Sequence, residues 1–149
     1  MEPDYIRRHL RLGWWSLLLF AASGLALELL HAFKVGWYLD VPSDTRRLMW
    51  TLAHAHGVGL SLVHVAFAAT LHALPARTGQ ARARLASACL SAATVCLPGG
   101  FLLGGLTSYG GDPGLGVLLV PAGAVFLLVA AGSTACLAGR RDRPPDSPL

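Results

Sequence analysis

Four long apolar runs constrain what this chain can fold into. They cover residues 13–33, 48–74, 85–106 and 115–138, and each can cross a hydrocarbon core about 30 Å thick as a helix of about 20 residues. In lipid every backbone polar group must be hydrogen-bonded within its own segment, and no run alternates as barrel strands do. The sequence therefore predicts an all-α integral membrane protein, a bundle of four transmembrane helices within residues 1–138.

The composition leaves little room for a soluble domain. Hydrophobic residues make up 54% of the chain and charged residues 13%, which is too apolar for an ordinary soluble protein. Residues 1–12 mix arginines with apolar side chains, and we expect them to lie at the membrane interface. Residues 139–149 hold three prolines and no apolar periodicity, so we predict a disordered tail.

The positions of the basic residues predict the orientation of the bundle. Nine arginines fall on one side of the predicted membrane and three basic residues on the other: Arg7, Arg8, Arg11, Arg77, Arg82, Arg84, Arg140, Arg141 and Arg143 against Lys34, Arg46 and Arg47. By the positive-inside rule both termini and the tail are cytoplasmic, and the predicted location is the bacterial inner membrane. Nucleic-acid binding is not expected, because it needs a continuous basic surface.

Ionisable side chains inside the spans are the main sign of function. A charged group at mid-bilayer costs roughly 2.5 to 3.5 kcal/mol, so its presence favours a functional site. Glu28 and His31 are three residues apart in the first span and share a helix face. His54 and His56, in "LAHAHG", lie at about the depth of Glu28, in the outer half of the bilayer. On a regular helix these two histidines point to nearly opposite sides, so we expect each to face a different neighbour.

The remaining histidines of the second span lie deeper or at its end. His64 is further from the outer interface, and His72 is predicted to stand apart at the inner interface.

Three interpretations of these groups remain open. The first is a metal site of Glu28, His31 and His54, a ligand set that suits iron or zinc. The second is haem b with an axial ligand drawn from His54, His56 or His64. In the third no cofactor binds, and the polar groups only hold the helices together.

The second span also carries a resemblance. The stretch "RRLMWTLAHAHGVGLSLVHVAFA" resembles the second helices of uncharacterised small bacterial four-span membrane proteins with an H-x-H-G pattern. It faintly resembles subunit I of the haem-copper oxidases as well, which implies haem ligation by His54 or His56. That family needs further histidines on later helices, and the third and fourth spans here have none. A complete oxygen-reducing centre is therefore not expected.

The expected function follows from these observations. It is a small membrane protein with a haem b or metal site in the outer half of the bilayer, serving electron transfer. The alternative is an accessory or structural subunit of a larger complex, or a homo-oligomer, with a partner docking through Gly100 and Gly104. No nucleophile with an adjacent base is evident, so we do not expect catalysis by the chain alone.

Overall fold

The computed structural model describes residues 4–39, 44–74, 79–107 and 111–139. The elements are α1 (Tyr5–Ala32), α2 (Gly36–Leu39), α3 (Asp44–Ala73), α4 (Gln80–Leu106), the 3₁₀ helix η2 (Leu115–Leu118) and α5 (Leu119–Ala138). Four helical stretches are long and apolar enough to cross a membrane, namely α1, α3, α4 and the stretch Leu115–Ala138. The predicted all-helical fold with four such helices is confirmed. The expected disordered tail after Gly139 lies outside the described residues.

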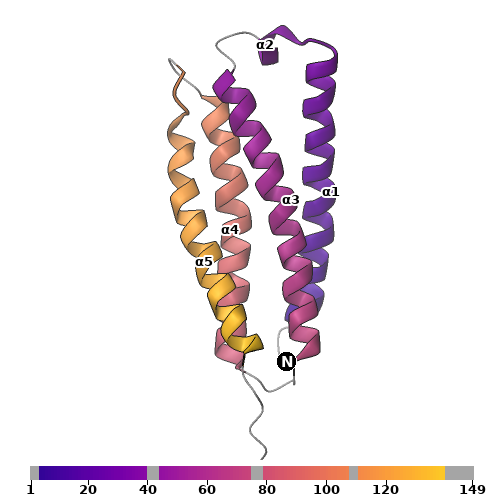
Figure 1. The fold of residues 1–149 in the computed structure, drawn as a ribbon, viewed down its shortest axis with the longest axis vertical. Helices are drawn as coiled ribbons and strands as arrows, with labels where there is room; N and C mark the ends of the chain where they lie inside the picture. Colours follow the sequence, from indigo (N-terminus) through magenta and orange to yellow (C-terminus); the bar gives the residue numbers. More distant parts are fainter. Residues whose placement is uncertain (1–3, 40–43, 75–78, 108–110, 140–149) are drawn as a thin grey trace, which may run out of the picture.

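The four long helices lie side by side in the order α1, α3, α4, α5 (Figure 1). Each long helix packs along its neighbours in this row, and α1 and α5 stand at its two edges. One end of the bundle holds the start of α1 and the end of α5, and we call it the terminal end. The other end, which carries α2 and η2, is called the loop end.

Helix α1 begins earlier than its apolar run predicts. Asp4 caps the helix by accepting a hydrogen bond from the backbone N–H of Arg7 at 3.0 Å, which satisfies one of the free N–H groups of the first turn. Residues 5–12 are therefore the first two turns of α1, continuous with the span, and not a separate interfacial stretch. This continuity brings His9 into the bundle, where its side chain is fully buried.

The core lies between α3 and α4 and extends to α5. Leu60 and Phe67 of α3 pack against Leu90 and Leu97 of α4. Alanines on α4, at positions such as Ala86 and Ala93, are completely buried, because short side chains let neighbouring helices approach closely. Helix α4 continues unbroken through Pro98, although the proline had suggested an interruption at that point. Of the α4 span 44% is buried, against 6% of the α1 span, so α4 is the centre of the fold.

The loop end is held together by two arginines of α3. Arg46 donates to the backbone carbonyl of Trp37 at 2.9 Å, and Arg47 donates to that of Tyr38 at 3.2 Å. The guanidinium of Arg46 also lies 4.6 Å from the centre of the Trp37 ring, a favourable cation–π contact. These bonds tie α2 to the start of α3 and leave Tyr38 buried.

Candidate functional site

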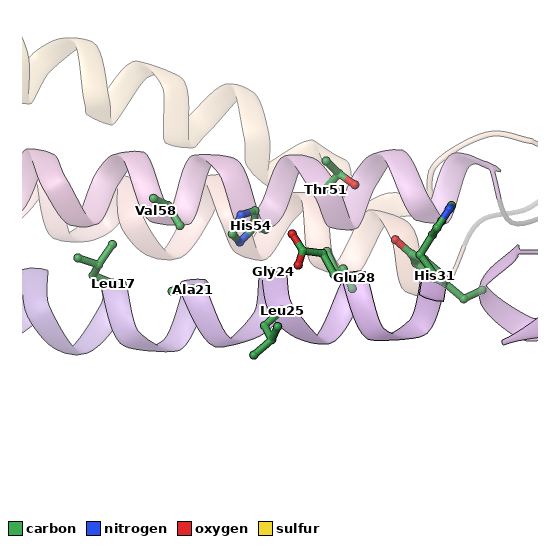
Figure 2. Close-up of a pocket in the computed structure, with 11 residues that line it drawn as sticks. Leu17, Ala21, Gly24, Leu25, Glu28, His31, Thr51, His54 and Val58 are labelled. Atoms are coloured by element: carbon green, nitrogen blue, oxygen red, sulfur yellow. The ribbon is translucent and has the colours of Figure 1, made fainter. Parts of the chain in front are cut away.

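A pocket of about 590 Å³ opens between α1 and α3 in the half of the bundle nearer the loop end (Figure 2). Most of its wall is aliphatic, and its polar members are Glu28 and His31 of α1 and Thr51 and His54 of α3, with Tyr38 of α2. The full lining is Leu17, Ala21, Gly24, Leu25, Leu27, Glu28, His31, Tyr38, Thr51, His54 and Val58. The described part of the first loop therefore contributes Tyr38 to the pocket, a residue that is not among the predicted site residues.

All three residues predicted as metal ligands line this one pocket. Glu28 and His31 project from α1 toward α3, and His54 lies across from them (Figure 2). Their side chains do not converge on one point, since among the described residues no three His, Cys, Asp or Glu side chains gather closely enough to hold a metal ion. The structure thus brings these residues to a common cavity without forming a complete set of metal ligands.

The hydrogen bond of His54 determines which of its ring nitrogens carries the proton. Its Nδ1 lies 2.7 Å from the carbonyl oxygen of Phe20 on α1, and a carbonyl can only accept, so Nδ1 carries the proton. In the neutral ring Nε2 then holds a lone pair, and it has no hydrogen-bond partner within the described part of the chain. A Cβ atom on Gly24 would overlap this ring, so the glycine provides the space in which the imidazole sits.

His56 faces the opposite side of α3. Its Nδ1 donates to the carbonyl of Leu52 at 2.8 Å, and its ring packs on Phe101 of α4 with 4.8 Å between ring centres. The prediction that His54 and His56 face different neighbours is confirmed. Because of this divergence, His56 does not line the pocket that His54 lines.

His64 belongs to a separate polar cluster near the terminal end. Its Nδ1 lies 2.6 Å from Nδ1 of His9, and its Nε2 lies 2.9 Å from Oγ1 of Thr94. Both ring nitrogens are thus already hydrogen-bonded, and an iron ligand at His64 would have to replace one of these bonds. His72 is exposed in the last turn of α3 and is not among the residues that line the pocket.

Sequence reasoning missed His9 because it placed residues 1–12 outside the membrane-spanning helix. A signal was nevertheless present. His9, Gly13, Ser16, Phe20 and Gly24 recur at intervals of three or four residues, which places them on one face of a helix. Small and polar residues on one face mark the side that packs against another membrane helix.

The glycine pair predicted to dock a partner packs inside the chain. A Cβ atom on Gly100 would lie 2.9 Å from the Val120 side chain, and one on Gly104 would lie 3.4 Å from that of Val117. The two glycines therefore allow α4 to approach η2 and the start of α5.

Comparison with family models, with curated proteins and with solved structures gives no match to this chain.

Proposed function

We propose that this chain is a multi-pass membrane protein that binds haem b in the pocket between α1 and α3, with Nε2 of His54 as the axial ligand. One observation carries the proposal. The Nδ1–H of His54 is held by the carbonyl of Phe20, so the lone pair is on the other nitrogen. Metal-bound histidines in proteins almost always donate their second ring nitrogen in this way, which fixes the ring and raises its basicity.

Haem fits the pocket better than a free metal ion does. A porphyrin supplies four equatorial nitrogens, so the protein needs to contribute as little as one axial side chain. A zinc or non-haem iron site needs about three protein ligands, and no group of three is gathered among the described residues. The pocket volume of about 590 Å³ lies within the range of about 300–1,000 Å³ typical of small-molecule and cofactor sites.

The other polar residues of the pocket would orient the ligand. His31 and Tyr38 lie on α1 and α2 toward the loop end, where an imidazole or phenol can donate to a carboxylate such as a haem propionate. The aliphatic wall, which includes Leu17 and Val58, suits an apolar macrocycle. When bound, haem b supplies one-electron redox chemistry, and the role we propose is electron transfer in the outer half of the bacterial inner membrane.

An absorption spectrum tests the proposal directly. Protein produced with haem supplied should show a Soret band, and His54→Gly should lose it. Because His54→Gly leaves a gap the size of an imidazole, added imidazole should restore the band. His56→Ala is the matched control, since it removes an imidazole from the same helix on the side facing α4, and it should keep the band.

Two outcomes would reject the haem assignment. One is a folded protein with no Soret band when haem is supplied. The other is a band that survives in His54→Gly without imidazole. The first outcome would favour the accessory-subunit function, and the second would mean that haem binds through a residue other than His54.

A further inference from the structure

A continuous chain of hydrogen bonds crosses three helices near the terminal end. Ser87 Oγ of α4 lies 2.8 Å from His9 Nε2 of α1, and His9 Nδ1 lies 2.6 Å from His64 Nδ1 of α3. His64 Nε2 then lies 2.9 Å from Oγ1 of Thr94, back on α4. Ser87, His9 and His64 are each at most 1% exposed. The two imidazole rings stack with centres 4.8 Å apart, so the chain is tightly held.

The direction of every bond in this chain follows from its far end. Thr94 Oγ1 donates its only proton to the carbonyl of Leu90 at 2.9 Å, so it must accept from Nε2 of His64. In a neutral ring Nδ1 of His64 is then an acceptor, and Nδ1 of His9 is the donor. Nε2 of His9 is left as an acceptor for the hydroxyl of Ser87. All donors point the same way, from Ser87 to Thr94.

This chain extends along the axis of α4. Ser87 and Thr94 are seven residues apart on α4, which is about 10 Å of helix rise. Ser87 lies in the half of α4 nearer the terminal end, and Arg8 donates to Ser91, one turn further along α4, at 3.5 Å. Thr94 lies at the middle of α4. The chain therefore ends near the middle of the bundle.

A short gap separates this chain from the pocket. His54 and His64 are ten residues apart on α3, about 15 Å. Between these levels Ser61 donates to Ser16 of α1 at 2.8 Å. The ring of Phe20 fills the remaining space by packing onto Gly57, where a Cβ atom would overlap it. The polar groups along the interface are therefore interrupted by one aromatic ring.

We propose that the helix interface centred on α1 and α3 is a proton path across the membrane. The chain from Ser87 to Thr94 is its half on the terminal side, the pocket with Glu28 and His54 is its other half, and Phe20 blocks passage between them. The proposal does not depend on haem binding. It concerns only the protein's side chains and the water that enters when Phe20 moves aside.

Proton balance along the chain is simple. Because Ser87 is buried, the proposed transfer requires water to reach its hydroxyl from the terminal end. A proton then joins Ser87 Oγ as the hydroxyl proton of Ser87 passes to Nε2 of His9. His9 gives its Nδ1 proton to His64, and His64 gives its Nε2 proton to Thr94. Thr94 releases its own proton to water in the interface. Each group gains one proton and loses one, so no charge remains in the apolar interior. Both rings are then in their other tautomers. Before a second proton can pass in the same direction, each ring must return to its first tautomer by exchanging protons with the water that enters when Phe20 moves aside.

Proton leak into vesicles tests the path. Haem-free protein is reconstituted into vesicles that contain a pH-sensitive dye, and a potassium gradient with valinomycin provides the driving potential. The wild-type chain, blocked by Phe20, should leak no faster than protein-free vesicles. Phe20→Ala should leak faster, and Phe20→Ala combined with His64→Gln should lose this leak. Glutamine retains an N–H donor for Thr94 but does not relay protons, so this variant should keep the fold.

Phe20→Ala combined with His72→Gln is the matched control and should leak like Phe20→Ala alone. The proposal is overturned if folded Phe20→Ala shows no added leak, or if His64→Gln leaves that leak unchanged. It is also overturned if Phe20→Ala releases the entrapped dye, because the opening would then be unselective. Circular dichroism and a monodisperse elution profile establish that each variant is folded. The leak measurements use haem-free protein, so they do not depend on whether His54→Gly loses the Soret band. Each of the two proposals can therefore fail without the other.

Discussion

At the level of single residues, the histidines differ in how their ring nitrogens are used. His9 and His64 use all four ring nitrogens in hydrogen bonds to other side chains, and a buried polar group that is fully hydrogen-bonded carries little penalty. His54 uses only Nδ1 in a hydrogen bond and lines a pocket. This difference is why we assign ligand binding to His54 and proton transfer to the His9–His64 pair.

Gly24 provides a test of the His54 site. In Gly24→Ala the new Cβ atom would overlap the His54 ring and displace it from the carbonyl of Phe20. Overpacking of this kind typically costs about 1–3 kcal/mol, so we expect a lower free energy of unfolding together with loss of haem. Unfolding of the detergent-solubilised protein in sodium dodecyl sulfate, followed by circular dichroism, measures the change in the free energy of unfolding.

Gly59→Ala is the control for this experiment, because a Cβ atom on Gly59 meets nothing within 4 Å. We expect it to be neutral or slightly stabilising. If Gly24→Ala and Gly59→Ala lowered the free energy of unfolding equally, the effect of Gly24→Ala could not be attributed to overlap with the His54 ring.

At the level of elements, α3 and α4 together join the two edges of the row. Helix α1 packs on α3, and α5 packs on α4, so α5 depends on close contact with one long helix. The contact between α4 and α5 is made by small residues. In lipid there is no hydrophobic force between helices, so their association depends on close van der Waals packing.

Gly123 and Gly132 of α5 form a matched pair for testing this contact. A Cβ atom on Gly123 would lie 2.8 Å from the backbone nitrogen of Leu97, whereas one on Gly132 meets nothing within 4 Å. Gly123→Ala should therefore push α5 away from α4 and lower the free energy of unfolding by about 1–3 kcal/mol. Gly132→Ala should be neutral or gain up to about 1 kcal/mol from helix propensity. The same detergent titration measures both, and a stable Gly123→Ala variant would contradict the packing described for α4 and α5.

At the level of the whole molecule, the fold puts both described chain ends at one end of the bundle (Figure 1). Five of the eight basic residues in the described ranges lie on α1 or α4 toward that end, namely Arg7, Arg8, Arg11, Arg82 and Arg84. The positive-inside rule therefore predicts that the terminal end is cytoplasmic. Reporter fusions after Arg84 and at Leu149 should then give cytoplasmic signals, and a fusion at Ser43 should give an external one. An external signal at Leu149 would reverse the sides that we assign to the pocket and to the His9–His64 chain.

The four membrane-length helices could be predicted from the sequence, because apolar runs of sufficient length have one backbone solution in lipid. It also determined that His54 and His56 diverge, since their spacing on any regular helix separates them by about half a turn. Depth along the helices was enough to place Glu28 and His54 in one layer.

Which imidazoles have side-chain partners could not be predicted from the sequence, because it depends on how the helices pack. His9 and His64 are 55 residues apart in the chain, and nothing in either local pattern specifies that α1 and α3 align them. The alignment depends on Gly13, Gly24 and Gly57, whose missing side chains let Val65, His54 and Phe20 fill the interface. The order of the helices in the row likewise depends on packing. An apolar helix face has similar surroundings in lipid and against another helix, so only the fit of its side chains decides which helix it contacts.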